Sequence, residues 1–218
     1  MVWEDVESYG ITDDSPLTYP LIKDKLIAIN VSLIKDAWRK KEPIDMCYSY
    51  DHDIDIECVK ESVTINGITI TSDVVMYTAD LPHLVPEIGW ADISYFGTQA
   101  MKQGMMRKGI SGFMSSDGAV WTANYPVYTV VGDTAIIKNM PTQGFSKGTL
   151  VAIREDPTSL SSWDSNDESE FPTPSPYKLI MLTRNEILKS LGRPDLVTDA
   201  QRQFNAPQQK QETRNEEN

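Results

Sequence analysis

The hydrophobic period of the chain changes at Pro43, and this change is the strongest constraint on the fold. Before Pro43, apolar residues recur every three to four positions, which is the spacing of one helical face. They are Ile22, Leu26, Ile29, Leu33 and Ala37. After a cationic last turn, Pro43 ends this pattern, and the period becomes two, as in a half-buried strand. The sequence therefore predicts a helix over 20–40 and then a β-domain over 45–157.

Two turn signals predict β-hairpins inside this β-domain. Asn66-Gly67 separates two strand-like runs, and Gly132-Asp133 separates two more. Asn-Gly is a strong hairpin signal because both residues accept positive φ angles. Other short strand-like runs are also separated by turn residues rather than by helices, which is typical of an antiparallel sandwich. We therefore expect an α+β fold, with an antiparallel β-sandwich-like domain, an N-terminal helix, a C-terminal helix and extended termini.

The segments outside the β-domain differ from it in composition. Residues 161–176 are polar and proline-rich, which predicts a loop, and residues 177–191 have the period of a second helix. Residues 1–16 are acidic and predict an extended N-terminal arm, whereas residues 199–218 have almost no apolar side chains and predict a flexible tail. The sequence predicts one folded domain over 17–198.

Charge and cysteine content limit the classes of partner. The 218 residues include 32 acidic and 20 basic side chains, a net charge of −12, which disfavours broad binding of nucleic acid or anionic membranes. Cys47 and Cys58 are too few for a disulfide framework or a four-cysteine zinc site. No apolar run reaches the roughly 20 residues of a membrane span, and the N-terminus lacks the cationic start of a signal peptide. We expect a soluble protein that is made in the cytosol and has no membrane partner.

The stretch DHDIDIE, residues 51–57, holds four carboxylates and a histidine. A calcium loop of the EF-hand type that began at Asp51 would need glycine at its sixth position and a bidentate carboxylate at its twelfth, where this chain has Ile56 and Ser62. With period two, the four carboxylates share one strand face, and Ile54, Ile56 and Cys58 share the other. The stretch therefore predicts a strand with an acidic solvent face, rather than an ion site.

Other catalytic or cofactor patterns gain no support from the sequence. His52 and His83 are too few for a histidine metal triad, and no nucleophile elbow or phosphate-binding glycine motif is present. We expect no catalytic, metal-binding or cofactor-binding residues and no cofactor. Aromatic residues on strands are more often core than a sugar-stacking or base-stacking surface; they include Trp90, Tyr95, Trp121, Tyr125 and Tyr128. The methionines at 101–106 fit an adaptable contact surface and core packing equally well.

Five stretches together suggest a family. They are SPLTYPLIKDKLIAINVSLIKDAWRKKEP, DIECV, LVPEIGWADISYFGT, YTVVGDTAIIKNM and GTLVAIREDPTSL. Over roughly residues 15–190 the chain resembles the ring, or head–tail adaptor, proteins in the neck of short-tailed bacteriophages, especially the crAss-like group. The resemblance rests on an initial helix, a late hairpin with a VxGxxxxI pattern and a strand that ends in an EDP turn. The segments 99–118 and 161–170 have no counterpart in that pattern.

The resemblance implies a structural virion protein and not an enzyme. It would be made in the bacterial host cytoplasm and would form a homo-oligomeric ring, a dodecamer, below the portal in the phage neck. The ring would extend the DNA channel and dock further tail proteins, and genomic DNA would pass without specific binding because acidic walls repel phosphates. The residues expected to contact partners are Trp3, Tyr9, Lys23, Lys35, Arg39 and Phe204.

Two other functions remain open at this point. One is a carbohydrate- or receptor-binding β-sandwich module of a phage tail, which would act through Trp121 and Tyr125. The other is a hydrolase that uses carboxylates of the 51–57 strand, with Asp53 and Asp55 as the residues to test.

Overall fold

A computed structural model describes residues 18–59, 62–98, 101, 104–115, 125–140, 146–159 and 171–192. Contacts divide the chain into two compact units, one formed by 1–42 with 173–218 and the other by 43–172. The sequence had predicted a single domain over 17–198. The predicted arm at 1–16 and tail at 199–218 lie outside the described residues.

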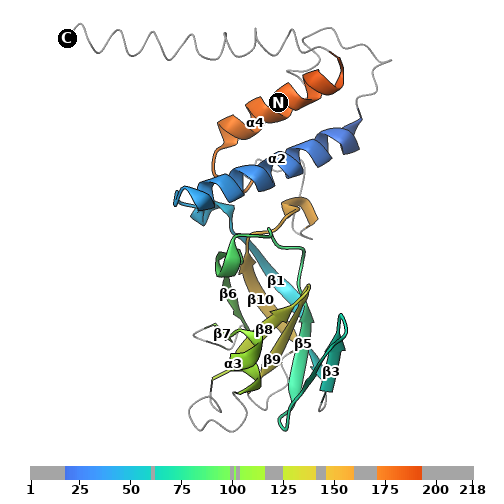
Figure 1. Ribbon diagram of the computed structural model, residues 1–218, viewed down its shortest axis with the longest axis vertical. Coiled ribbons are helices and arrows are strands. Elements are labelled where there is room, and N and C mark those ends of the chain that lie inside the picture. Colours follow the sequence, from blue (N-terminus) through green and yellow to red (C-terminus); the bar gives the residue numbers. More distant parts are fainter. Residues whose placement is uncertain are drawn as a thin grey trace, which may run out of the picture. The chain divides into compact units, whose positions relative to one another are not determined.

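The first unit contains two helices that pack against each other, α2 (Tyr19–Arg39) and α4 (Pro176–Ser190) (Figure 1). Both match the helices predicted over 20–40 and 177–191. A proline in the first turn suits each helix start, because proline lacks only an amide hydrogen that has no intrahelical partner there. Ile22 of α2 and Ile187 of α4 are buried in one apolar cluster, so each helix uses its apolar face for the contact. In the described part of the chain, no helix is long and apolar enough to cross a membrane.

The second unit is built from strands and contains only short helical turns in its described residues. The strands are β1 (Ser49–Asp55), β2 (Glu57–Val59), β3 (Ser62–Ile65), β4 (Ile68–Thr71), β5 (Met76–Asp80), β6 (Ile93–Gly97), β7 (Met106–Arg107), β8 (Val127–Val131), β9 (Thr134–Lys138) and β10 (Lys147–Ala152). The helical turns are η1 (Asp45–Cys47), η2 (Gly89–Asp92), η3 (Pro157–Ser159) and α3 (Ile110–Met114).

The strands form two facing sheets and one hairpin. One sheet has the order β1-β10-β6 and the other β2-β5-β9-β8-β7, while β3 and β4 pair with each other. Pairing within the sheets is antiparallel except between β7 and β8. The predicted α+β, sandwich-like fold is therefore confirmed. Both predicted hairpins form, and Asn66 and Gly67 have φ angles of 50° and 78°, as the turn between β3 and β4 requires.

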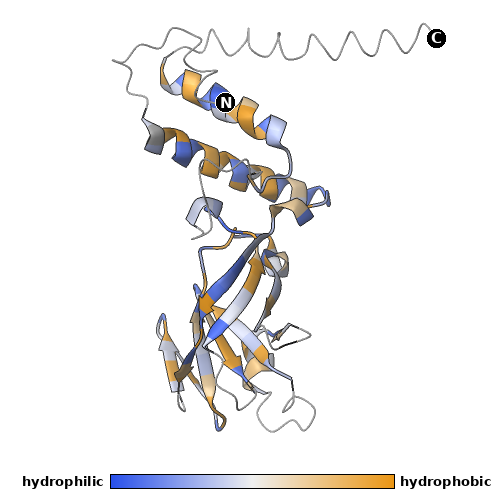
Figure 2. Ribbon diagram, turned by 180° about the vertical axis from the view of Figure 1, so that it is seen from behind, coloured by the Kyte–Doolittle hydropathy of each residue, from blue (hydrophilic) through white to orange (hydrophobic). Residues whose placement is uncertain are grey.

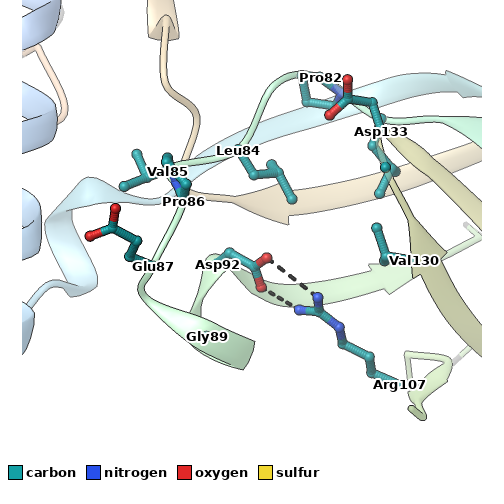
Figure 3. Close-up of a pocket in the computed structure, with 12 residues that line it drawn as sticks. Pro82, Leu84, Val85, Pro86, Glu87, Gly89, Asp92, Arg107, Val130 and Asp133 are labelled. Atoms are coloured by element: carbon teal, nitrogen blue, oxygen red, sulfur yellow. Dashed lines mark hydrogen bonds and ion pairs between the residues drawn. The ribbon is translucent and has the colours of Figure 1, made fainter. Parts of the chain in front are cut away.

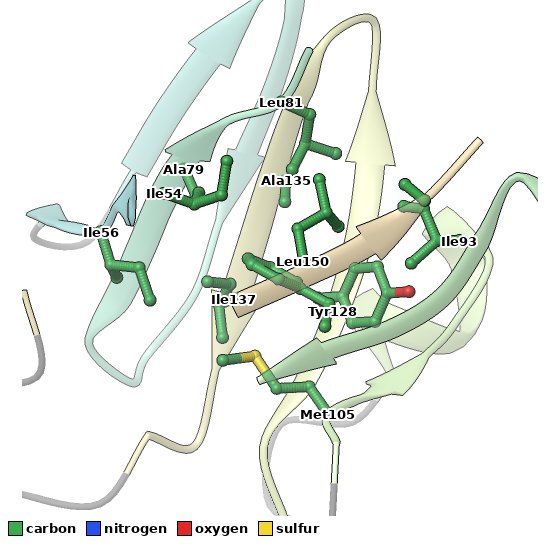
Figure 4. Close-up of a cluster of buried hydrophobic side chains, with 12 residues drawn as sticks. Ile54, Ile56, Ala79, Leu81, Ile93, Met105, Tyr128, Ala135, Ile137 and Leu150 are labelled. Carbon is green, nitrogen blue, oxygen red and sulfur yellow. The ribbon is translucent and has the colours of Figure 1, made fainter. Parts of the chain in front are cut away.

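The main core lies between the two sheets. Figure 4 shows Leu150 of β10 together with Ile137 of β9 and Tyr128 of β8, so both sheets contribute to one cluster. Ile136, next along β9, belongs instead to a second cluster with Ile70 of the β3–β4 hairpin. The five-stranded sheet is thus covered on both faces, which explains why β8 and β9 are buried along most of their length, while β1 is more exposed and mostly hydrophilic (Figure 2).

The two sheets are joined at both sides. At one side the chain runs from β1 into β2 through the single residue Ile56, so one extended segment belongs to both sheets. At the other side the amide of Met105 donates to the carbonyl of Phe96 at 2.7 Å, which links β6 to the segment that enters β7. These links protect strand edges that would otherwise be open to pairing with other chains.

The DHDIDIE stretch forms a strand, as predicted, but its simple alternation was wrong. Asp51 is opposite Leu150 and Ile54 is opposite Gly148, so β1 advances three residues while β10 advances two. The extra residue is a β-bulge, which changes which side chains face inward. Asp51 shares the inner face with core residue Leu150, whereas Asp53 and the two following acidic residues are exposed.

Burial of Asp51 is compensated by Arg154, which follows β10. The two side chains form an ion pair, and they are only 18% and 4% exposed. Among the described residues, the Nε of Arg154 has no hydrogen-bond acceptor, so Asp51 is the main compensation for this buried guanidinium. A second correction concerns Cys58, which was expected on the buried face and is exposed.

Candidate functional site

The centre of the candidate site is an ion pair between Asp92, the last residue of η2, and Arg107 of β7 (Figure 3). The contact is bidentate: Nη1 of Arg107 donates to Oδ1 of Asp92, and Nη2 donates to Oδ2 at 3.4 Å. Both side chains are mostly buried. The backbone of Asp92 is also fixed, because its carbonyl accepts a hydrogen bond from the Ile153 amide at 2.8 Å. The pair is therefore a rigid feature rather than a loose surface contact.

A hollow of about 450 Å³ lies on one side of the pair, and we call it the charged hollow (Figure 3). Three carboxylates line it, those of Glu87, Asp92 and Asp133, against the single guanidinium of Arg107. Asp133 also contacts Nδ1 of His83 at 3.1 Å. The remaining walls are mainly apolar and come from Leu81, Pro82, Leu84, Val85, Pro86, Gly89, Val130 and Gly132. The hollow therefore combines an apolar wall with net negative charge.

A second hollow, of about 430 Å³, also has Arg107 in its wall, and we call it the aromatic hollow. Its other lining residues are Trp90, Ile93, Ser94, Tyr95, Phe96, Gly104, Met105 and Tyr128. Trp90 is 64% exposed, and the guanidinium of Arg107 lies 5.8 Å from the centre of its ring. This cation–π contact holds an exposed indole beside the hollow.

Two glycines let the ring of Tyr95 lie flat against the backbone in the aromatic hollow. A Cβ atom on Gly97 would approach the Tyr95 hydroxyl to 2.5 Å, and one on Gly104 would approach its ring to 2.9 Å. Any larger residue at either glycine would displace this ring. The shape of the hollow is therefore encoded in part by the glycines at 97 and 104.

Tyr128 contributes a neutral phenol to the aromatic hollow. Burial raises its pKa to about 12, while nearby Arg107 lowers the pKa and Asp92 raises it. The phenol therefore stays protonated across the physiological range and can act as a hydrogen-bond donor, but not as a base.

A third hollow, of about 330 Å³, is the acidic cleft between β1, β2 and β5. Its carboxylates are Asp53, Asp55, Glu57 and Asp80. The ammonium of Lys147 contacts Asp55 at 2.7 Å, and this hydrogen bond raises the pKa of Lys147. Within the described residues, no group of three or more His, Cys, Asp or Glu side chains is arranged to hold a metal ion. The cleft is a solvent-exposed acidic surface.

Four exposed apolar side chains lie on or next to strand β7, helix α3 and the start of β8. They are Met106, Ile110, Met114 and Tyr125, and we call them the β7 patch. Met106 is joined to the start of β8 by a hydrogen bond from its amide to the Pro126 carbonyl, at 3.0 Å. Neighbouring Met105 is buried in the core, which is one of the two uses that the sequence left open for these methionines, whereas Met106 is exposed.

The structure does not bring the predicted contact residues into this site. Lys23, Lys35 and Arg39 lie on α2 in the other unit, where Arg39 pairs with Asp36 at 3.6 Å. Trp3, Tyr9, Phe204 and also Trp121 lie outside the described residues. Tyr125 is exposed but lines neither hollow beside the ion pair.

The sequence favoured core packing over a binding surface for Trp90 and Tyr95, but Trp90 is 64% exposed, and the charged residues near it were not predicted. Asp92 follows Trp90 closely and could have been included with it, because both belong to the short turn GWAD. The sequence around Arg107 carried no such signal. Arg107 reaches the site because the two-residue strand β7 pairs in parallel with β8.

A scan of the chain against protein-family models finds no match, and a search of curated proteins finds no similar sequence.

Proposed function

We propose that the chain is a structural virion protein, a ring-forming head–tail adaptor of a short-tailed, crAss-like bacteriophage. It extends the DNA channel below the portal and docks further tail proteins. The observation that carries the proposal beyond the sequence resemblance is the β7 patch. Single exposed apolar residues are ordinary, but a group on consecutive elements is typical of an interaction surface. Methionine and tyrosine, which supply three of its four members, are enriched in interfaces.

A closed ring needs two different surfaces on each copy, because every copy contacts one neighbour on each side. We propose Tyr50 and His52 of β1 as the second surface. Tyr50 is 64% exposed, and its ring stacks with that of His52 at a centroid distance of 6.5 Å. In the strand orders β1 and β7 are each terminal, so the two surfaces lie on separate strands of the unit. In the ring, the β7 patch of one copy contacts Tyr50 and His52 of the next.

The same proposal gives the acidic cleft a role in DNA passage. Its carboxylates, of which Asp55 is paired with Lys147, repel the phosphate backbone, so a channel wall that contains them does not retain DNA. A solved assembly with a net positive channel wall would refute this part of the proposal.

The mass and symmetry of the assembled protein test the ring. Twelve copies of a 24.5 kDa chain give a closed ring of about 290 kDa, measurable by native mass spectrometry and visible by electron microscopy. Met106→Glu places a charge in the proposed interface and should leave a monomer. Val75→Glu changes an exposed apolar residue outside both surfaces and should preserve the ring. A chain that stays monomeric within the virion contradicts the proposal, as does a ring that survives Met106→Glu.

A carbohydrate- or receptor-binding module of a phage tail is the second candidate, favoured by the exposure of Tyr125. Glycan-array binding by the isolated chain, lost in Tyr125→Ala, would support this module over the adaptor. The hydrolase alternative would require an activity that falls on Asp53→Asn or Asp55→Asn.

A further inference from the structure

We infer that Asn66-Gly67, the turn of the β3–β4 hairpin, is a site of spontaneous deamidation, and that the folded turn holds the reaction back until the hairpin opens. The co-reactant is water, and the products are aspartate and isoaspartate. This inference goes beyond the proposed function, and it holds whether or not the chain forms a ring.

The residues of this turn suit the reaction. Asn66 is the only asparagine of the chain that is followed by glycine. The main-chain nitrogen after an asparagine can attack the side-chain amide, and glycine has no side chain that would hinder this approach. Both residues are exposed, so water reaches them. Asn139 also has a positive φ angle, of 60°, but Met140 follows it, so Asn66 is the more reactive of the two.

The reaction has two steps. In the first, the nitrogen of Gly67 bonds to Cγ of Asn66, the Cγ–Nδ2 bond breaks, and the Gly67 amide proton leaves with Nδ2 as ammonia. A succinimide ring remains. In the second step, water opens the ring: its hydroxyl adds to one of the two ring carbonyl carbons, and its other hydrogen returns to the Gly67 nitrogen. Breaking the bond from nitrogen to Cγ gives aspartate, and breaking the main-chain bond gives isoaspartate. One water is consumed and one ammonia is released.

The folded turn holds the reacting atoms away from this ring. The φ angles of Asn66 and Gly67, 50° and 78°, match a type I′ turn, whose first central residue has a ψ angle of about 30°. To close the ring, the main chain of Asn66 must rotate far from that angle. The side-chain amide is also restrained, because a Cβ atom on Gly132 would lie only 2.6 Å from Nδ2 of Asn66. The amide therefore lies against the backbone of the β8–β9 turn, and the reaction requires the hairpin to open.

The hairpin is held closed mainly by its inner face. Ile70 of β4 is 1% exposed and belongs to one cluster with Met76 and Ile136. On the outer face, the hydroxyl groups of Thr64 and Thr69 are in contact at 3.0 Å. In the described part of the chain, β3 and β4 pair only with each other, so no other strand pair must separate when they open. Such a unit opens locally, without unfolding of the whole chain, and this local opening sets the rate of the reaction.

The isoaspartate product should keep the hairpin from closing again. Isoaspartate carries the main chain through Cβ and Cγ, which lengthens a turn of two residues whose length fixes the pairing of Ile65 with Ile68. The product also places a carboxylate against Gly132, where the neutral amide of Asn66 lay. Ile70 then no longer keeps both its partner on β3 and its place in the cluster.

The test follows Asn66 and Asn139 by peptide mass spectrometry in the full chain, which is incubated folded or unfolded in guanidinium chloride in the same mildly alkaline buffer. Asn66 should be converted in the unfolded chain, and at least roughly tenfold more slowly in the folded chain. Asn139 should react much more slowly than Asn66 in the unfolded chain. Asn66→Gln should remove the reaction, because its longer side chain would have to close a larger ring.

A matched pair of variants tests whether local opening sets the rate. Ile70→Val weakens the inner face of the hairpin and should speed conversion of Asn66 in the folded chain by roughly two- to tenfold. Ile187→Val makes the same change at an equally buried residue of the other unit and should leave the rate unchanged. Circular dichroism checks that each variant folds. If Ile70→Val does not fold, Ile65→Val replaces it, since Ile65 is partly buried against the same cluster.

The inference is overturned if Asn66 is not converted in the unfolded chain, if the folded chain reacts as fast as the unfolded one, or if the Ile70 and Ile187 variants change the rate alike. Hydrogen exchange of the isoaspartate product should show lost protection in β3 and β4, and unchanged protection there overturns the effect on the hairpin. Because the ring is measured by mass and symmetry and this site by the conversion of Asn66, failure of one leaves the other standing.

Discussion

Replacing Asp51 by asparagine should strongly destabilise the second unit, residues 43–172, although the change affects only one of several acidic residues on β1. The reason is the β-bulge, which turns Asp51 toward the inner face and places it against Arg154. With the carboxylate charge removed, a guanidinium that is only 4% exposed stays buried without its counter-charge. Among the described residues, the Nε of Arg154 already has no hydrogen-bond acceptor, so we expect no neighbouring group to replace the lost carboxylate as a partner of the guanidinium.

The expected magnitudes follow from the burial of each partner. Breaking a buried ion pair from one side typically costs about 3–5 kcal/mol. We expect about 3 kcal/mol for Asp51→Asn, near the lower end of the range, because Asp51 lies partly exposed and water can approach. Arg154→Met should cost about 2 kcal/mol, since the remaining carboxylate is less buried than the guanidinium. The double variant should cost no more than about 2 kcal/mol, which gives a coupling energy of about 3 kcal/mol.

Urea unfolding followed by far-ultraviolet circular dichroism measures these values, and urea avoids the screening of charges by a salt denaturant. Asp55→Asn is the matched control, because Asp55 also lies on β1 and pairs with Lys147 of β10, but both side chains are more than half exposed. It should leave the unfolding midpoint unchanged. If Asp51→Asn is as mild as Asp55→Asn, the inward orientation of Asp51 and the bulge that causes it are refuted.

Three further outcomes are expected. Tyr128→Phe should make the stability of the fold less sensitive to alkaline pH. The Tyr128 phenol has a pKa of about 12 in the folded chain and about 10 in the unfolded chain, so the wild-type fold loses stability as the pH rises from 10 to 12, by at most about 3 kcal/mol. The midpoint of alkaline unfolding measures the difference between the two chains. Gly148→Ala should cost about 1–3 kcal/mol in urea unfolding, because its Cβ would lie 3.2 Å from a backbone carbonyl of β6, whereas Gly109→Ala meets no atom within 4 Å and should be neutral. Deleting Asp53 removes the extra residue of the bulge and leaves Ile54 and Ile56 facing the core, so the chain should still fold. Deleting Asp55 instead turns Ile56 away from the core and should abolish the circular dichroism signal of folded protein.

Much of the fold could be predicted from the sequence because its signals are local. The helical period of 20–40 depends on residues within one helix, and Asn66-Gly67 adopts the positive φ angles of its hairpin turn through its own backbone. The division into two units could not be predicted in this way. It depends on α4 packing against α2, more than a hundred residues earlier in the chain.

The bulge shows why the acidic strand was misread. Alternation assumes one residue opposite one residue, and a single extra residue reverses the inner and outer faces on one side of it. The partner that justifies an inward carboxylate, Arg154, lies about a hundred residues away in sequence. Arg107 was missed for a similar reason, because its place beside Asp92 comes from strand pairing and not from its neighbours in the chain.

The bulge also changes what the acidic stretch can do in the proposed ring. Asp51 is neutralised by Arg154 inside the unit, so it contributes little to an external field. Of the remaining carboxylates, Asp55 shares its charge with Lys147, which leaves Asp53, Glu57 and Asp80 to dominate the acidic cleft. If the channel wall repels DNA, these three residues are the source of the repulsion. A ring in which Glu57 and Asp80 are both replaced by lysine should then retain DNA during ejection. In a ring that carries Asp51→Asn, each chain should be less stable, but DNA passage should be unchanged.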